Sequence, residues 1–253
     1  SNTKIITCYA AMKYLGDSLE GLRYYFPDAT TSLIQPTGDP TFLQADFVRQ
    51  PVYDFLKKTD RQSFIICDSN FTGHPYGLGW SWDDYEEDYM PERSAFPVYD
   101  NMVTVKNIQG MFQIQPSYFK VNDGLKANAD SVKNKYRIKR MIHTNDFYAV
   151  RADETTDSTH IPFITGDGLL ATLLKDTLHK SFVTDHHIRL NKEDYTVIYS
   201  GRTDSLLKIM MHRSDNFFAE QSLLMGGNRL TEEMNDGKVI DTVLRKAQRV
   251  MTE

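Results

Sequence analysis

The order of the hydrophobic patterns constrains the fold of this 253-residue chain more than any other feature. Residues 4–15 repeat apolar side chains every three to four positions, and so do residues 204 onward, as helices require. Between them, residues 101–150 alternate apolar and polar side chains, as half-exposed strands do. A strand-rich block between two helical ends is typical of an inserted domain. We therefore predict an α+β protein in which residues 1–20 and 200–253 form one helical part, and residues 21–199 form a β-rich insert with helices.

Shorter patterns place the elements within this outline. Strands are predicted at residues 32–35, 63–67 and 196–199 and around Ile188, and a helix at 168–178. Residues 45–56 also have helical periodicity, although Pro51 must begin a turn or kink that helix. The first helix should bury its apolar face, which carries Ile5, Cys8, Ala11, Met12 and Leu15.

The composition is that of a globular protein, with 40% apolar and 25% charged residues. It argues against a transmembrane segment and against nucleic-acid binding. No apolar run approaches the length needed to cross a bilayer, so no transmembrane segment is expected. The net charge of −5 argues against nucleic-acid binding, which needs a basic stripe to neutralise phosphates. Cys8 and Cys67 lack metal-ligand spacing and are expected to be buried apolar side chains; whether they pair is left open.

Two clusters of charged or histidine side chains suggest other functions. His186 and His187 beside Asp185 suggest a metal site, but adjacent histidines on a strand point to opposite faces, so no metal or other cofactor is expected. The alternating basic side chains from Lys133 to Arg140 are typical of a solvated strand face, with contact to an anionic glycan polymer as the alternative.

Residues 213–221, Arg-Ser-Asp-Asn-Phe-Phe-Ala-Glu-Gln, lie between two helical patterns. Ser, Asp and Asn are preferred at helix N-caps, because their side-chain oxygens accept hydrogen bonds from free backbone N–H groups. The simplest interpretation is therefore a capped junction between two helices. The alternative is a catalytic role, in which Ser214 relays a proton and Asn216 holds a substrate amide.

The start of the chain, Ser1-Asn2-Thr3-Lys4, places a hydroxyl group and an amine three residues apart at a helix start. Positions i and i+3 share a helix face, so the amine can reach the hydroxyl group. A lysine beside a serine acts as general base when its neutral form is populated, which is the Ser/Lys route to nucleophilic catalysis. The spacing alone is a weak signal, because it recurs at Ser117–Lys120 and Ser205–Lys208.

Several motifs occur together in one order over nearly the whole chain. The first motif is Ser1-Asn2-Thr3-Lys4-Ile5, followed by Ala10-Ala11 and Leu15-Gly16. Three shorter motifs come next: Gly-Asp-Pro-Thr at 38–41, Gly-Trp-Ser-Trp-Asp-Asp at 79–84 and Ser-Ala-Phe at 94–96. The last motif is Ser214-Asp215-Asn216, followed by Ala219-Glu220-Gln221. This series resembles the D-alanyl-D-alanine carboxypeptidase/endopeptidase family, the low-molecular-mass class C penicillin-binding proteins. The resemblance implies the helical part of a β-lactamase/penicillin-binding-protein-type catalytic domain, with a large insert between the first and second active-site motifs.

The resemblance also implies a mechanism. Ser1 would attack a D-Ala-D-Ala or D-amino-acid cross-link bond of a peptidoglycan stem peptide, and Lys4 would take its proton. Ser214 would pass a proton to the leaving amine, and Asn216 would hold the acyl-side amide and orient Lys4. β-Lactams would acylate Ser1 for the same reason, and the protein would act in the periplasm or elsewhere outside the cytoplasm.

A substrate pocket in the insert follows from the same resemblance. Asp84 and Tyr89 match positions that line the pocket for the stem-peptide diamino acid, since a carboxylate and an aromatic ring suit an ammonium group on an aliphatic stem. For Asp84, a cap or turn role is the alternative.

The chain departs from the family pattern in one important respect. The third motif, Lys-Thr-Gly, is absent, and the nearest string is Lys58-Thr59-Asp60. The missing strand would supply half of the oxyanion hole, so these residues by themselves are expected to be poor catalysts. The chain also starts without Met or a signal peptide, and we expect a fragment, a processed form or the ordered part of a longer protein. A non-catalytic peptidoglycan-binding or scaffold protein of the same fold is the alternative function; the oligomeric state and the balance of carboxypeptidase and endopeptidase action are left open.

Overall fold

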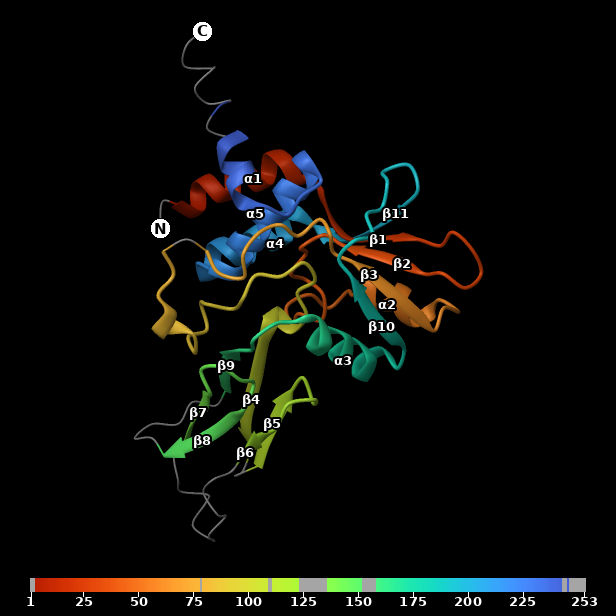
Figure 1. The fold of residues 1–253 in the computed structure, drawn as a ribbon. Helices are drawn as coiled ribbons and strands as arrows, with labels where there is room; N and C mark the ends of the chain where they lie inside the picture. The colour runs from red at the N-terminus through yellow and green to blue at the C-terminus, as the bar shows by residue number, and fades with distance from the viewer. Residues whose placement is uncertain are drawn as a thin grey trace. The chain divides into compact units, whose positions relative to one another are not determined.

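The computed structural model describes residues 3–77, 79–108, 111–122, 136–151, 158–242 and 245 (Figure 1). These residues form two compact units. Unit 1 takes its residues from 1–77, 93–100 and 167–253, and unit 2 from 78–92 and 101–166. The predicted division at residues 20 and 200 stays a prediction. Both positions lie inside strands of unit 1 that pair with each other, and unit 2 begins much later in the chain.

Unit 1 contains a mixed five-stranded sheet with the order β10-β3-β2-β1-β11. Its strands are β1 (Ser18–Tyr25), β2 (Leu33–Pro36), β3 (Ser63–Cys67), β10 (Ser181–Asp185) and β11 (Thr196–Arg202). β1 is antiparallel to both β2 and β11, whereas β3 is parallel to β2 and β10. The predicted strands at 32–35, 63–67 and 196–199 are confirmed, but the one expected around Ile188 lies earlier, at β10.

Three helices of unit 1 pack together and carry the two ends of the motif series. They are α1 (Thr3–Leu15), α4 (Thr203–Arg213) and α5 (Asn216–Thr231), and each contacts the other two. Their shared core includes Ala11, Leu15, Leu206, Met210 and Phe218, all nearly inaccessible to solvent. The helical ends of the chain therefore meet in space, as predicted.

The buried face of α1 differs from the prediction. Ile5 and Met12 are 58% and 64% exposed, while Ala10, Ala11 and Leu15 are buried. The small alanine side chains allow α1 to lie close to α5, so the helix is rotated away from the position that its largest apolar side chains indicate.

Two further helices of unit 1 pack beside its sheet. α3 (Asp167–Leu178) contacts β10 (Figure 1), and α2 (Pro51–Lys58) contacts β11. The helix predicted over residues 45–56 therefore begins only at Pro51. Proline is favoured in the first helical turn, where its missing N–H group needs no partner.

Unit 2 contains two three-stranded sheets, which confirms the strand-rich pattern of residues 101–150. One sheet has the order β5-β4-β9, with β4 (Met102–Ile108), β5 (Met111–Gln115) and β9 (Ser158–Pro162). The other has the order β6-β8-β7, with β6 (Val121–Asn122), β7 (Tyr136–Arg140) and β8 (Phe147–Arg151). A short 3-10 helix, η1 (Trp82–Asp84), precedes them in the chain.

Two sequence expectations concern membranes and cysteines. Among the described helices, none is both long and apolar enough to span a bilayer. Cys8 and Cys67 are both free thiols; Cys67 is buried as predicted, whereas Cys8 is only half-buried.

Two adjacent glycines of α5 give a matched test of the packing. A Cβ atom on Gly227 would lie 2.8 Å from the Glu233 carbonyl oxygen and 2.9 Å from that of Asn235, whereas one on Gly226 would meet only Val239, at 4.0 Å. We expect Gly227→Ala to lower the free energy of unfolding by about 1–3 kcal/mol through overpacking. Gly226→Ala should raise it by about 0.5–1 kcal/mol through helix propensity. Urea unfolding measures both, and equal effects of the two substitutions would contradict this account of α5.

Candidate active site

The junction between α4 and α5 has the cap that its sequence predicts. Asp215 is the N-cap of α5, and its Oδ1 atom accepts a hydrogen bond from the Phe218 N–H at 2.9 Å. Ser214 ends α4 in a left-handed conformation (φ 57°, ψ 38°), and its N–H group donates to the Met210 carbonyl oxygen. The chain therefore turns sharply between the two helices and places Asn216 at the first position of α5.

The structure brings Lys4 and Asn216 together. The Nζ atom of Lys4, in the first turn of α1, donates a hydrogen bond to Oδ1 of Asn216 at 2.6 Å, across 212 residues of sequence. This contact follows from the packing of α1 on α5. Ser1 lies outside the described residues, so the serine–lysine pair itself stays a prediction. The first and second motifs nevertheless meet through their amine and amide groups.

Two carboxyl groups lie near the Lys4 amine. Burial raises the pKa of Asp215, while the hydrogen bond from Phe218 and the positive charges of Arg213 and Lys4 oppose that rise. Burial also raises the pKa of Glu220, one turn further along α5, and Arg93 and Lys4 oppose it. Lys4 therefore lies in a partly buried environment that contains both negative charge and an amide acceptor.

Arg93 is a supporting residue that the sequence interpretation missed. Its side chain is only 2% exposed, and its guanidinium group lies 3.0 Å from Glu220 and 3.0 Å from Asp236. It also donates to the carbonyl oxygens of His74 at 3.0 Å and Tyr76 at 3.1 Å. The only sequence signal was its position directly before the Ser-Ala-Phe landmark. Arg93 ties the first turns of α5 to two other segments of unit 1.

Three of the landmark segments converge on Gln221. Its Nε2 atom donates to the carbonyl oxygens of Gly38 at 2.7 Å and Ser94 at 3.0 Å, and its Oε1 atom accepts from the Ser94 N–H at 3.3 Å. Gln221 is fully buried. The segments at 38–41 and 94–96 therefore hold α5 in place, next to the helix that carries Lys4.

The two candidate substrate-binding residues, Asp84 and Tyr89, lie in unit 2. Asp84 ends η1, and a hydrogen bond from the Tyr89 hydroxyl group to Asp84 raises the pKa of Tyr89, because the neighbouring carboxylate disfavours the phenolate. The carboxylate and the aromatic ring are thus adjacent. Their role in substrate binding stays a prediction.

The basic side chains of β7 anchor the acidic loop around Asp84. Arg140 is 1% exposed, donates to the Tyr85 carbonyl oxygen at 3.2 Å and lies 5.0 Å from the centre of the Tyr85 ring. The backbone N–H group of Arg140 also donates a hydrogen bond to Oε1 of Glu86 at 2.7 Å. The prediction of a solvated strand face is therefore wrong for Arg140, because its charge is satisfied inside unit 2. Lys133 and Lys135 lie outside the described residues.

His186 forms a charged bridge in unit 1. Its Nδ1 atom lies 2.7 Å from Asp68 and its Nε2 atom 2.8 Å from Asp167. The three side chains come within 4.8 Å of one another, which is close enough for metal ligands. Because both ring nitrogens can donate only in the imidazolium form, the protonated ring supplies the positive charge between the two carboxylates. His187 takes no part in this cluster.

The His186 bridge gives a pH-dependent contribution to stability. The hydrogen bond to Asp68, with the charges of Asp68 and Asp167, raises the pKa of His186 above its usual 6.5. Its stabilisation should be complete below pH 6.5 and be lost as the pH rises through the folded-state pKa. We expect His186→Gln to lower the melting temperature at pH 5.5 and to lower it much less at pH 9. His187→Gln is the control, and an equal loss at both pH values for His186→Gln would contradict the charged bridge.

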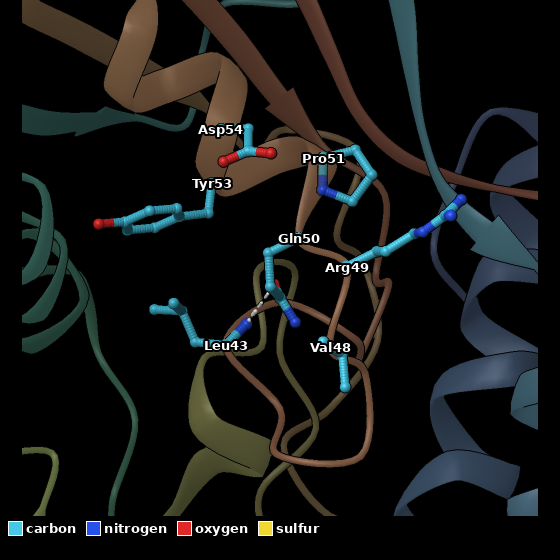
Figure 2. A pocket seen from close by; sticks show the side chains of 7 residues that line it. All are labelled: Leu43, Val48, Arg49, Gln50, Pro51, Tyr53 and Asp54. Carbon is cyan, nitrogen blue, oxygen red and sulfur yellow. Dashed lines mark hydrogen bonds between the residues drawn. The ribbon is translucent and has the colours of Figure 1, made fainter.

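A surface hollow of about 690 Å³ lies elsewhere on unit 1. Figure 2 shows the side chains that line it, which are Leu43, Val48, Arg49, Gln50, Pro51, Tyr53 and Asp54. None of the candidate catalytic residues lines this hollow.

The fold of this chain is similar to that of proteins of known structure. The chain resembles the crystal structure of penicillin binding protein 4 from Haemophilus influenzae, with a TM-score of 0.67 and 16% sequence identity over 98% of this chain and 62% of that one. The structure of the same protein complexed with a β-lactam gives a TM-score of 0.60 and 14% identity over 98% and 60% of the two chains. The chain thus spans less than two thirds of that protein and shares its α+β penicillin-binding-protein fold.

A search of curated protein sequences finds no match. The family comparison matches residues 1–246, which is nearly the whole chain. By that match, the chain belongs to the D-Ala-D-Ala carboxypeptidase 3 (S13) family.

Proposed function

We propose that the protein is a serine-type D-Ala-D-Ala peptidase that hydrolyses peptidoglycan stem peptides outside the cytoplasmic membrane, where that polymer lies. The observation that carries the proposal is the 2.6 Å hydrogen bond from Lys4 Nζ to Asn216 Oδ1, which joins the two active-site motifs. Membership of the S13 family supports the same reaction. The likeness to a penicillin-binding protein that was crystallised with a β-lactam supports covalent inhibition by that class of compound.

The reaction assigns one role to each motif residue. Ser1 Oγ attacks the carbonyl carbon of the penultimate D-Ala, and its proton passes to Lys4 Nζ. As the C–N bond breaks, the Ser214 hydroxyl group passes a proton to the leaving amine and takes up the proton held by Lys4, which returns Lys4 to its neutral form. Water then hydrolyses the Ser1 ester and releases the shortened peptide. Because Lys4 occupies Oδ1 of Asn216, the Nδ2 group is the one that donates to the acyl-side amide of the substrate.

In this proposal, two further residues determine substrate preference. Asp84 binds the ammonium group of the stem-peptide diamino acid, and the Tyr89 ring packs on its aliphatic stem. No Lys-Thr-Gly occurs in the 253 residues, and the terminal carboxylate of the substrate is left without an assigned partner.

Release of D-alanine tests the proposal. The complete natural protein is incubated with a peptide that ends in Lys-D-Ala-D-Ala, with the lysine side chain either free or acetylated. We expect D-alanine release that Ser1→Ala abolishes, and a preference for the free amine that Asp84→Asn removes. Binding to peptidoglycan without any release of D-alanine would instead favour the non-catalytic scaffold.

A further inference from the structure

The chain leaves unit 1 through three successive residues with left-handed backbone. Tyr99, Asp100 and Asn101 have φ values of 54°, 57° and 54°. Such a conformation costs about 1–2 kcal/mol for each residue other than glycine, so it persists only where the surroundings hold it. In unit 1, the Tyr99 hydroxyl group lies 2.9 Å from Thr177 Oγ1, and Asp100 Oδ2 accepts a hydrogen bond from Gln44 Nε2 at 3.0 Å. Asp100 is thus held in a defined place.

A series of side-chain contacts leads from Asp100 to the candidate active site. Gln44 Nε2 donates to Asp46 Oδ2 at 2.8 Å as well as to Asp100. Asp46 in turn accepts two hydrogen bonds from the guanidinium group of Arg213, at 2.5 and 2.6 Å. Arg213 is the last residue of α4 and directly precedes Ser214. Asp100 is therefore linked to the turn at Ser214 through three side chains.

The loop that carries these contacts is itself braced. Gln50 Oε1 accepts a hydrogen bond from the Leu43 N–H at 2.9 Å, drawn as a dashed line in Figure 2. Gln50 Nε2 donates to the carbonyl oxygens of Thr41 at 2.9 Å and Phe47 at 2.8 Å. The Phe47 ring lies 6.1 Å from that of Phe218 on α5. The loop can therefore act as a fixed support for Arg213.

The charges around Asp100 are unbalanced. The carboxyl groups of Asp46 and Asp215 and the guanidinium group of Arg213 face it. Its Oδ1 atom is buried and has no hydrogen-bond partner in the part of the chain that the structure describes. Burial raises the pKa of Asp100 to about 7; the two carboxylates add to this rise, and Gln44 and Arg213 oppose it. Near neutral pH, Asp100 thus changes from a neutral acid to a third negative charge.

We propose that Asp100 is a positioning residue that fixes the turn at Ser214 through Gln44 and the Asp46–Arg213 pair. In its neutral form, the carboxyl group supports the turn by accepting the hydrogen bond from Gln44. In its ionised form, it is a charge buried away from water that also repels the neighbouring carboxylates of Asp46 and Asp215, and the turn loosens. The inference rests on the proposed function, which assigns catalytic roles to Ser214 and Asn216.

The variant Asp100→Asn tests this role in the complete natural protein. Asparagine keeps the shape and the acceptor, tolerates left-handed backbone and cannot ionise. Since burial raises the pKa of Asp100 to about 7, the wild-type carboxyl group is more ionised at pH 8 than at pH 6. The measured quantity is the rate constant of acylation by a fluorescent penicillin, and the ratio compared is that of Asp100→Asn divided by that of the wild type. We expect this ratio to be near one at pH 6. At pH 8 it should rise about three- to tenfold, since slight misplacement of catalytic groups slows reaction.

The ratio reports the effect of Asp100 alone, because the other titrating groups occur in both proteins and their pH dependence cancels. Asp54→Asn, at an exposed position in unit 1, is the matched control and should leave the ratio at one throughout. A ratio for Asp100→Asn that does not change between pH 6 and pH 8 would overturn the inference.

Hydrogen–deuterium exchange separates this inference from the proposed function. Relative to Asp100→Asn at the same pH, amides 213–218 of the wild type should exchange faster at pH 8 and equally at pH 6. If this happens in a protein that forms no penicillin adduct, the proposed function fails and the support of the turn by Asp100 stands. If the exchange rate of these amides in the wild type, relative to the rate in the variant, is the same at pH 6 and pH 8, the inference fails whatever the activity.

Discussion

Replacing Lys4 by methionine should lower the rate constant of acylation by benzylpenicillin about 10²–10⁴-fold, the usual contribution of a general base. Methionine keeps the length and much of the apolar stem of lysine but removes the amine that donates to Asn216 Oδ1. Without it, no group named in the proposed mechanism takes the Ser1 proton. Stopped-flow measurement with a fluorescent penicillin, at protein concentrations where binding is saturated, gives the rate constant directly.

The same substitution at Lys13 provides the control. Lys13 lies in the last turn of α1, is exposed, and interacts with the side chains of Tyr9 and Tyr14. Lys13→Met should change the acylation rate constant less than about twofold, because surface substitutions seldom shift free energies by more than about 0.5 kcal/mol. Equal rates for Lys4→Met and Lys13→Met would remove Lys4 from the mechanism.

Replacing Arg93 by methionine should lower the free energy of unfolding by about 3–5 kcal/mol, the usual result of removing one partner of a buried ion pair. The guanidinium group, 2% exposed, is bonded to both Glu220 and Asp236, so its loss leaves two carboxyl groups facing each other. Burial already raises the pKa of Glu220 in the presence of Arg93. Without Arg93 the pKa of Glu220 rises further, and the destabilisation should be greater at pH 8 than at pH 5.

Arg202 gives the matched comparison for Arg93. It pairs with Asp204 at 2.7 Å, but both side chains are largely exposed, at 73% and 64%. Arg202→Met should therefore cost about 1 kcal/mol or less. Chemical denaturation of the three proteins at pH 5 and pH 8 measures the effects. Losses of similar size at Arg93 and Arg202 would show that the buried network does not hold α5.

The sequence predicts strands well where their burial is visible in the chain itself. β3 matches its predicted range because its apolar side chains form a continuous run. β1 was missed because it carries Glu20 and Arg23, which are normally exposed residues. Both are buried here, paired with each other at 2.8 Å and, for Glu20, with Arg229 of α5. A partner more than 200 residues away gives no local signal.

The candidate site, like the strands, could be predicted from the sequence only in part. The contact between Lys4 and Asn216 could be anticipated, because both residues lie in motifs whose types and spacing point to one reaction. The supports around them could not. Arg93 is separated by 127 residues from Glu220 and by 143 from Asp236, and Asp100 is linked to the Ser214 turn through side chains of another loop and of α4. Such networks depend on tertiary packing, and no periodicity or motif reveals them.

The position of a covalent β-lactam adduct tests the central claim most directly. The complete natural protein is treated with benzylpenicillin, digested and analysed by mass spectrometry. If Ser1, Lys4 and Asn216 form one Ser/Lys active site, the added mass lies on the peptide that contains Ser1 and is greatly reduced in Lys4→Met. A folded protein that carries no adduct, or carries it on a residue other than Ser1, would contradict the account.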